Sequence, residues 1–379
     1  MTSELSSLCS YAKGKVSVDT LSKRNYVSTE NMMPNKGGIV DAGALPSAQY
    51  TQQYIKDDIL VSNIRPYFKK IWMAYDDGGC SNDVLVFRAD RGCDSTFLYY
   101  ILANDAFFNY ASATSKGTKM PRGDKTAIMQ YKVPCFNYET QLRIGKLLRS
   151  IDDRIAVNKK INDNLQQQLF SLYENMATAS PCLKEYTLSN LCDFQEGYVN
   201  PPQTHPEYFD GEVKWLRAVD INESFIIETS RTLTKAGFES AKKSALLFEP
   251  NTIAISKSGT IGRLGIIADY MCGNRAVINI APHDTNMLAF IYCFLKSKQR
   301  EFPDMAVGSV QKNLYVSLLE PLSVSIPDNE SLTAFNAVGA SILGMIHNNC
   351  VENTDLANLR DTILPKLMSG EIDVSSVLL

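Results

Sequence analysis

An internal repeat constrains this chain more than any other feature of its sequence. Residues 5–14, Leu-Ser-Ser-Leu-Cys-Ser-Tyr-Ala-Lys-Gly, resemble residues 188–197, Leu-Ser-Asn-Leu-Cys-Asp-Phe-Gln-Glu-Gly. Five positions are identical at an offset of 183 residues, and Tyr11 corresponds to Phe194. This period is far longer than that of a solenoid repeat. The sequence therefore predicts a two-copy duplication with a pseudo-two-fold architecture.

The offset between the two copies changes along the chain. In the middle of each half it is 192, where Cys80, Asn82 and Tyr100 correspond to Cys272, Asn274 and Tyr292. Strand-like runs there match as well, 59–62 with 253–256 and 84–87 with 276–279. Near the end of each half the offset is 191 without a gap. Loops tolerate insertions, whereas one inserted residue rotates the apolar stripe of a packed helix. We therefore expect diverged globular parts followed by long helices.

The helical segments show a heptad pattern. From Thr140 to Met176 the seam positions are separated by alternating steps of four and three residues, which is typical of a coiled coil. The second copy repeats the pattern, although Gly339 and Arg360 interrupt it, and Pro365 is expected to kink or end that helix. The residues predicted to pair the helices are Ile151, Ile155, Asn158, Asn162 and Leu165 in the first copy and Ile342, Ile346, Asn349, Asn353 and Leu356 in the second.

Each predicted helix spans about 35 residues, or roughly 50 Å. One such seam is not stable alone in water, so two seams in one chain favour pairing with each other. A two-fold relation between the halves makes that pair antiparallel and brings the asparagines together near its centre. A buried asparagine at a seam position costs stability but fixes the register. The alternative is that each helix packs only on its own domain.

The remaining parts have the pattern of mixed α/β domains, with short β-branched and aromatic runs separated by Gly, Pro and Asn turns. We expect two similar globular domains joined by two long antiparallel helices. The predicted boundaries are 1–138 for the first domain, 139–180 for the central helix, 181–328 for the second domain and 329–379 for the C-terminal helix and tail.

Basic and polar residues gather in loops at corresponding places in both halves. Cations and backbone N–H groups suit phosphates, while Arg, Gln and Asn suit base edges. A solvated charged loop explains each stretch taken alone, but their recurrence favours nucleic-acid binding. The residues predicted to contact DNA are Arg65, Lys69, Lys70, Lys116, Lys119, Arg122 and Lys125 in the first half and Arg217, Lys257, Ser258, Arg263, Gln311, Lys312 and Asn313 in the second.

Composition narrows the choice of function. The formal net charge of −3 is unusual for a protein that binds DNA alone, because phosphate contacts supply most of such affinity. Basic residues must then be clustered, or partners must contribute charge. Nine cysteines without a Cys-x-x-Cys motif and three dispersed histidines disfavour a metal site. No apolar run approaches membrane-spanning length, so we expect a cytoplasmic protein that does not contact a membrane.

Three stretches resemble catalytic motifs but lack an essential part. Asn200-Pro-Pro-Gln203 has Gln203 where an amino-methyltransferase needs an aromatic residue to stack the flipped base. Gly259-Thr-Ile-Gly262-Arg-Leu-Gly265 matches neither phosphate-binding motif and is expected to be a turn between two strands. Glu212-Val-Lys214 lacks a suitably spaced acidic partner for a nuclease site. The sequence therefore predicts no catalytic residue in this chain.

These features together resemble the specificity subunits of type I restriction-modification enzymes. The doubled Leu-x-x-Leu-Cys…Gly opening carries the resemblance, together with the stretches 58–67, 215–221, 259–266 and 311–314 and the end of the last helix at 364–372. The resemblance covers essentially the whole chain. No single motif is decisive, but their order, doubling and spacing are specific together.

The resemblance implies a non-catalytic subunit that recognises a bipartite sequence in double-stranded DNA, with one half-site for each domain. It implies that the helices set the gap between half-sites and dock two methyltransferase subunits, and that restriction subunits join the larger complex. S-adenosylmethionine is then expected in the partner chains and no cofactor in this one. Two alternatives stay open at this point: a protein-binding scaffold with duplicated domains, and an enzyme with its own methyltransferase or nuclease site.

Overall fold

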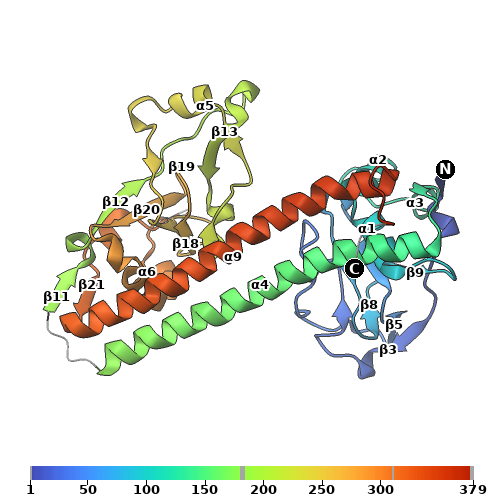
Figure 1. Ribbon diagram of the computed structural model, residues 1–379, viewed down its shortest axis with the longest axis horizontal. Coiled ribbons are helices and arrows are strands. Elements are labelled where there is room, and N and C mark those ends of the chain that lie inside the picture. The colour runs from blue at the N-terminus through green and yellow to red at the C-terminus, as the bar shows by residue number, and fades with distance from the viewer. Residues whose placement is uncertain (1, 180–183, 310, 376–379) are drawn as a thin grey trace. The chain divides into compact units, whose positions relative to one another are not determined.

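A computed structural model describes residues 2–179, 184–309 and 311–375, and the chain divides into two compact units. Unit 1 comprises residues 1–154 and 356–379, and unit 2 comprises residues 155–355. Each unit contains one mixed α/β globular domain, domain 1 or domain 2, together with a part of each long helix (Figure 1). The predicted fold class is thus confirmed.

In domain 1 a run of short strands precedes three short helices and a last strand, and the first long helix follows. The elements are β1 (Thr2–Glu4), β2 (Cys9–Tyr11), β3 (Lys15–Ser17), β4 (Tyr26–Val27), β5 (Tyr50–Tyr54), β6 (Ile59–Ser62), β7 (Ile71–Met73), β8 (Gly78–Cys80), β9 (Val84–Ala89), α1 (Ser95–Ala103), α2 (Asp105–Ala113), α3 (Lys125–Met129), β10 (Lys132–Pro134) and α4 (Tyr138–Ala179).

Domain 2 has a similar order of elements and is followed by the second long helix. They are β11 (Lys184–Thr187), β12 (Cys192–Glu196), β13 (Phe209–Leu216), β14 (Phe225–Ile226), β15 (Thr232–Leu233), α5 (Lys235–Glu239), β16 (Leu247–Phe248), β17 (Ile253–Ser256), β18 (Leu264–Ile267), β19 (Met271–Gly273), β20 (Val277–Pro282), α6 (Leu288–Lys298), α7 (Phe302–Met305), α8 (Val316–Leu319), β21 (Ser323–Ile326) and α9 (Asn329–Ser369).

The duplication is visible in the sheets. The main sheet of domain 1 has the strand order β2-β9-β6-β7, and that of domain 2 has the order β12-β20-β17-β18-β14. The shared four strands pair antiparallel in both domains. Each domain also has a second sheet and a two-stranded ribbon. In domain 1 these are β3-β5-β8-β4 and β1-β10, and in domain 2 they are β15-β13-β19-β16 and β11-β21. The two domains therefore share a topology as well as sequence motifs.

The strand register corrects one part of the sequence alignment. Ser62 pairs with Val84 in domain 1, and Ser256 pairs with Val277 in domain 2. Val84 therefore corresponds to Val277, at an offset of 193 rather than 192. The match of Cys80 to Cys272 is wrong for the same reason. A one-residue shift along a strand turns a side chain to the opposite face of the sheet. Cys80 packs with Val84, whereas Cys272 packs with Trp215 on the other side of its sheet.

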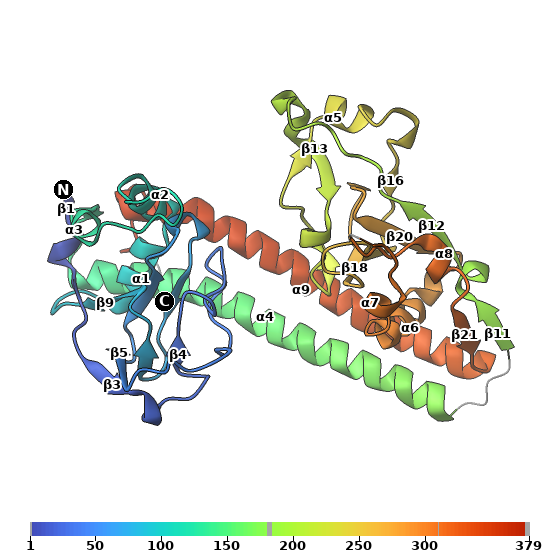
Figure 2. The same cartoon turned by 180° about the vertical axis from the view of Figure 1, so that it is seen from behind.

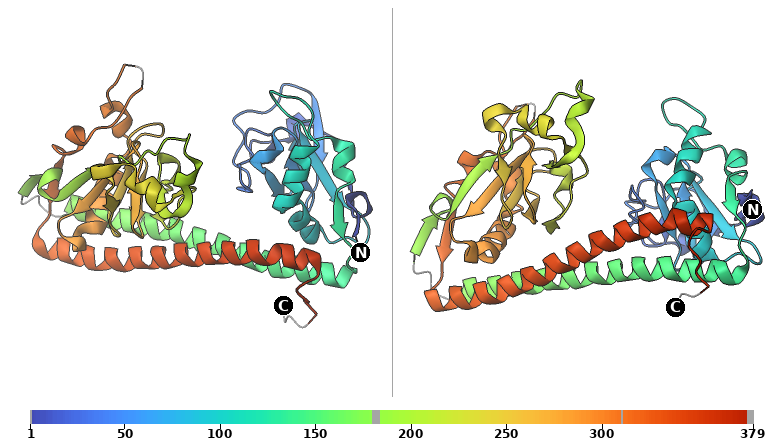
Figure 3. Two further views of the ribbon diagram at one scale, coloured as in Figure 1. Left: turned by 90° about the horizontal axis from the view of Figure 1, so that it is seen from above. Right: turned by 45° about the horizontal axis from the view of Figure 1, so that its top comes forward.

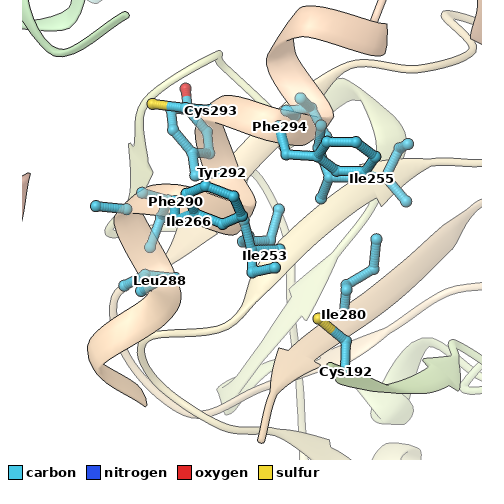
Figure 4. Packing of buried hydrophobic residues seen from close by; sticks show 14 of the residues in the cluster. Cys192, Ile253, Ile255, Ile266, Ile280, Leu288, Phe290, Tyr292, Cys293 and Phe294 are labelled. Carbon is cyan, nitrogen blue, oxygen red and sulfur yellow. The ribbon is translucent and has the colours of Figure 1, made fainter. Parts of the chain in front are cut away.

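The core of domain 2 lies between its main sheet and α6 (Figure 4). Ile253 and Ile255 of β17 face the aromatic residues of α6, whereas Ala254 between them faces a separate buried cluster. This alternation is the two-residue period of a strand. Each unit has buried clusters of its own, because the core residues of domain 1 form different clusters. The two domains are therefore packed independently of each other.

The long helices belong to both units. In unit 1, Ile144 and Leu148 of α4 and Leu364 and Leu367 of α9 are buried in the core of domain 1. In unit 2, α4 and α9 lie side by side and contribute to the core of domain 2 (Figure 3). Helix α4 begins at Tyr138 and α9 begins at Asn329. Helix α9 continues through Pro365 and ends one turn later, at Ser369.

Candidate nucleic-acid interface

Two basic loops of domain 1 that are distant in sequence form one structural cluster, here called loop pair 1. It consists of residues 63–70, between β6 and β7, and residues 114–124, between α2 and α3. Lys116 and Arg122 exchange backbone hydrogen bonds of 2.8 and 2.9 Å, which closes the second loop on itself. The Arg65 N–H donates to the Pro121 carbonyl at 2.8 Å and thereby joins the two loops. Two separately predicted stretches thus meet at one place.

The backbone of loop pair 1 is held in a conformation that side chains disfavour. Arg65 and Lys69 flank a short 3-10 helix at residues 66–68 and have φ angles of 50° and 52°. Lys36 of a neighbouring loop has φ of 61°, and its N–H donates to the Lys69 carbonyl at 2.8 Å. Left-handed conformations cost free energy for residues with a Cβ, and such strain clusters at functional sites. The loop is therefore fixed before any ligand binds.

Several predicted contact residues of domain 1 are already engaged with the protein. The contacts are Lys69 Nζ to Asp105 Oδ2 at 2.7 Å, Lys70 Nζ to the Thr29 carbonyl at 2.6 Å, Lys116 Nζ to Asp124 Oδ2 at 2.5 Å and Arg122 Nη2 to Asp83 Oδ1 at 3.0 Å. Exposed ion pairs of this kind are worth only about 0–1 kcal/mol. Lys69, Lys116 and Arg122 can therefore exchange a carboxylate for a phosphate at small cost.

The carboxylates beside these lysines are kept ionised. The hydrogen bond from Lys116 holds the pKa of Asp124 below its ordinary value, and two backbone N–H groups add to this effect. For Asp105, desolvation opposes ionisation, but hydrogen bonds from Lys69 and Lys36 outweigh it and lower the pKa. Burial lowers the pKa of Lys70. Loop pair 1 thus has its charges partly balanced internally.

Three other predicted contacts in domain 1 have no side-chain partner among the described residues; Lys119 and Lys125 are exposed, whereas Nε of Arg65 is buried. The side chains of Arg65, Lys119 and Lys125 form no hydrogen bond or ion pair within residues 2–179, 184–309 and 311–375. Lys119 lies at the exposed tip of its loop, and Lys125 is the first residue of α3. These three cations are the ones most available to a phosphate or a base edge.

A hollow beside loop pair 1 adds residues that the sequence analysis missed. It is lined by Lys13, Lys15 and Lys125 together with polar side chains, and no carboxylate lines it. We call it the lysine groove. Tyr11 lies at its edge and donates a hydrogen bond of 2.9 Å to the Lys125 carbonyl. The two additional lysines flank Gly14 of the repeated opening motif, which was the available sequence signal.

Domain 2 has the equivalent cluster, here called loop pair 2. Residues 257–263 connect β17 to β18, which confirms the predicted turn between two strands. Residues 307–309 and 311–314 precede α8, and α7 and α8 flank them (Figure 2). Val307 and Asn313 exchange backbone hydrogen bonds of 3.0 and 2.9 Å, and the Leu314 N–H donates to the Lys257 carbonyl at 2.9 Å. The backbone arrangement of loop pair 1 therefore recurs with different side chains.

Within loop pair 2 only some predicted residues are available to a ligand. Lys257 Nζ lies 2.9 Å from Glu196 Oε1 and 4.8 Å from the ring centre of Tyr315, which makes it part of the loop's support. Asn313 Nδ2 donates to the Gln311 carbonyl at 3.0 Å. The remaining side chains of the prediction have no hydrogen-bond or ion-pair partner among the described residues: Ser258, Arg263, Gln311 and Lys312.

Arg217 lies outside loop pair 2. It precedes a short 3-10 helix at residues 218–220, and its Nη2 donates to Ser230 Oγ at 2.5 Å. Its guanidinium lies 5.5 Å from the ring centre of Trp215, and its Nε lies 3.6 Å from Asp220 Oδ2. The structure thus gives Arg217 an internal supporting role, and its contact with DNA stays a prediction.

The paired helices meet through the predicted asparagines in unit 2. Asn158 Nδ2 donates to Asn353 Oδ1 at 3.1 Å, and Asn349 Nδ2 donates to Asn162 Oδ1 at 2.8 Å. Increasing residue numbers on α4 thus meet decreasing numbers on α9, so the helices are antiparallel. Of the other predicted pairing residues, Ile151, Ile342 and Ile346 are buried, and Ile155, Leu165 and Leu356 are half-buried.

In unit 1 a polar contact explains an interruption of the heptad pattern. Arg360 of α9 donates from Nη1 to Asp152 Oδ1 of α4 at 2.7 Å. Tyr100 of α1 donates to the other oxygen of the same carboxylate at 2.6 Å. Arg360 thus replaces an apolar seam residue because it binds a carboxylate that also holds domain 1 on the helix pair. No pattern in the sequence indicates that Asp152 is the partner of Arg360.

Two of the stretches that resemble catalytic motifs are engaged in contacts within the protein. Gln203 accepts a hydrogen bond from Arg231 Nη1 at 3.0 Å, and Lys214 is paired with Asp269 at 3.0 Å. In the described parts of the chain no group of three or more His, Cys, Asp or Glu residues is placed to hold a metal ion. A search of the same residues finds no helix long and apolar enough to span a membrane.

A family model described as the type I restriction modification DNA specificity domain matches the chain twice, at residues 1–167 and 183–354. The chain belongs to this family. The two matches reproduce the duplication and together cover most of the sequence. The specificity subunit can therefore be compared directly with its relatives.

Two relatives are named as specificity subunits. That of the MjaIX type I restriction enzyme from Methanocaldococcus jannaschii is 24% identical over 76% of this chain and 71% of its own length. That of the HindI enzyme from Haemophilus influenzae is 27% identical over 45% of this chain and 38% of its own length. The crystal structure of the type I S subunit from M. genitalium matches with a TM-score of 0.57 and 18% identity, covering 97% of this chain and 96% of that one. It shows the same fold.

Proposed function

We propose that each domain of this specificity subunit recognises one half of a bipartite sequence in double-stranded DNA. The observation that carries the proposal is the recurrence of one loop arrangement in both domains with different side chains. In both loop pairs the second loop is closed by a pair of backbone hydrogen bonds and donates one more to the residue that begins the first loop. Yet one pair presents Arg65 and Lys119 and the other presents Arg263 and Gln311. Two similar folds with unlike side chains suit two unlike half-sites.

Within each loop pair the residues divide by chemistry. Arg, Gln and Asn can bind base edges in the major groove, whereas lysines mainly bind phosphates and fix the position of the protein. We assign base recognition to Arg65 in domain 1 and to Arg263 and Gln311 in domain 2. The lysines at the loop tips, Lys119 and Lys312, are assigned to phosphates.

We further propose that the long helices dock two methyltransferase chains, which supply the catalytic residues and bind S-adenosylmethionine, and that restriction subunits join that complex. Exposed apolar pairs at spacings of four and seven residues, each on one face of its helix, support this proposal. Val157 and Ile161 of α4 and Val338 and Met345 of α9 are each between 41% and 50% exposed. Exposed apolar side chains along a helix are typical of an interaction surface.

The proposal is tested with the chain co-expressed with its methyltransferase partners. A complex purified at low salt is incubated with a random DNA library and S-adenosylmethionine, and the methylated molecules are sequenced. We expect two short conserved half-sites separated by a fixed number of unspecified base pairs. A continuous recognition sequence would contradict recognition by two domains. DNA binding that does not weaken with salt would instead favour a protein-binding scaffold.

A further inference from the structure

One end of loop 257–263 in domain 2 is held by a side chain from α6. Gln299 caps the C-terminus of α6, and its Nε2 donates to the Gly262 carbonyl at 3.0 Å. Gly262 has φ of 85°, and a Cβ at this position would lie 2.9 Å from Cβ of Phe302. Gly262 precedes Arg263, so this contact fixes the backbone that carries a proposed base-contacting residue.

The same amide of Gln299 binds Glu223, a residue in a strained conformation. Glu223 has φ of 63°, a left-handed conformation that costs free energy for a residue with a Cβ. Its Oε1 accepts from Gln299 Nε2 at 2.8 Å, and its Oε2 is paired with Lys296. Strain of this kind persists only where surrounding contacts fix it. Glu223 is therefore held in place by the residues around it.

The backbone carbonyl of Glu223 reaches the long helix α4. It accepts hydrogen bonds from Gln166 Nε2 at 3.0 Å and from the Tyr292 hydroxyl at 3.2 Å. A continuous path of polar contacts therefore runs from Gln166 through Glu223 and Gln299 to Gly262. It connects α4, on which we propose that a partner docks, to a loop that we propose binds DNA.

Loop 63–70 of domain 1 is supported differently. Its Lys69 is paired with Asp105 of α2, and Asn35 and Lys36 donate backbone hydrogen bonds to it from a neighbouring loop of the same domain. None of the hydrogen bonds of residues 63–70 in the described chain involves α4. The path from the loop through the side chains of Gln299 and Glu223 to the helix is thus a feature of domain 2.

We propose that Glu223 is a positioning residue that fixes loop 257–263 on helix α4 and so couples sequence recognition by domain 2 to that helix. Recognition by domain 1 does not depend on this path. The inference rests on the proposed bipartite recognition and deepens it, because it makes the two half-sites unequal. A change at α4 then alters the fidelity of one half-site and leaves the other unchanged.

The test uses the complex with methyltransferase chains and the methylation library. Gln299→Ala removes the contact at the loop, and Gln166→Ala removes the contact at the helix. We expect both to reduce discrimination against wrong base pairs about three- to tenfold, the equivalent of one net hydrogen bond. Both variants should lose discrimination at one half-site only. It should be the half-site that Arg263→Ala also affects. The salt dependence of DNA binding stays unchanged, because no phosphate contact is removed.

Matched controls come from neighbouring residues. Arg300→Ala and Gln167→Ala change exposed residues that line a hollow together with Gln166 and Gln299 but have no hydrogen bond or ion pair among the described residues. Both are expected to behave as wild type. Gln299→Glu keeps the shape of the side chain but directs an acceptor at the Glu223 carboxylate and the Gly262 carbonyl. It is expected to reduce discrimination at least as much as Gln299→Ala, whereas a merely space-filling role predicts no change.

The outcomes separate this inference from the proposed function. Unchanged specificity in Gln299→Ala, or an equal loss at both half-sites, would overturn the inference. An effect of Gln299→Ala without one of Gln166→Ala would overturn the coupling to α4. In all these cases the wild-type complex still gives a bipartite site. A wild-type complex without a bipartite site would instead refute the proposed function.

Discussion

Among the single residues of domain 1, the lysines that line the lysine groove differ from other lysines in having no acidic side chain beside them in that hollow. Lys13, Lys15 and Lys125 line a hollow without any carboxylate. Elsewhere in the same domain, lysines such as Lys116 and Lys132 are paired with acidic side chains. Cations that converge without acidic neighbours raise the local positive potential and attract a polyanion. The chain's negative net charge is thus compatible with DNA binding, because its free cations gather locally.

We predict that replacing Lys13, Lys15 and Lys125 together by alanine reduces the salt dependence of DNA binding. Each phosphate contact contributes about 0.9 to the slope of log K against log salt concentration. The slope should therefore become less steep by up to about 2.7, with affinity falling equally for specific and non-specific DNA. Fluorescence anisotropy of the complex over a salt series measures both quantities. Lys132→Ala is the control, and an unchanged slope in the triple variant would rule out phosphate binding in the groove.

The sequence predicted the basic loops but not the groove beside them. Each loop is a continuous stretch, so its charge is visible in the sequence. The groove combines the turn after β2, strand β5 and the start of α3, and these segments come together only through the fold. The false match of Cys80 to Cys272 has a related cause. Residue identity alone cannot fix a strand register, which depends on hydrogen bonds to the neighbouring strands.

At the scale of elements, Gly339 shows why α9 departs from its heptad pattern. A Cβ at this position would lie 2.6 Å from Cβ of Ala289 on α6 and 3.4 Å from Leu169 on α4. Both of these residues belong to the buried core of domain 2. The glycine therefore permits α9 to approach α6 closely. The heptad spacing correctly predicted both long helices because it is a local pattern, but it contains no information about a third helix that packs against them.

We predict that Gly339→Ala lowers the free energy of unfolding by about 1–3 kcal/mol, because overpacking a core contact costs that much. Gly344→Ala lies in the same helix, where an added Cβ meets no atom within 4 Å. It should have the opposite effect and stabilise the chain by about 0.5–1 kcal/mol, because alanine is the better helix former. Urea unfolding followed by circular dichroism distinguishes the two. Equal stabilisation by both substitutions would show that α9 and α6 do not approach closely at Gly339.

At the scale of the whole molecule, the chain consists of two units whose hydrophobic cores do not share residues. The buried clusters of unit 1 contain Ile59 and Phe87, and those of unit 2 contain Ile253 and Ile280, the equivalent strand residues of the two copies. Substitutions at distant sites without shared partners have additive effects. The sequence predicted this division from the repeat, because two copies of a folding unit each contain a complete core pattern.

Independence of the two units makes the effects of Arg65 and Arg263 separable. Arg65 lies in the loop after β6, and Arg263 lies in the loop after β17, the equivalent strand of domain 2. We predict that Arg65→Ala relaxes specificity at one half-site and Arg263→Ala at the other, each by about 1–3 kcal/mol for a lost bidentate base contact. The double variant should relax both half-sites. Its total loss of discrimination should equal the sum of the two single losses to within about 0.5 kcal/mol. The methylation library measures all three variants under identical salt conditions. If both single variants relaxed the same half-site, the two loop pairs would be contributing to one recognition surface, and the assignment of one half-site to each domain would be wrong.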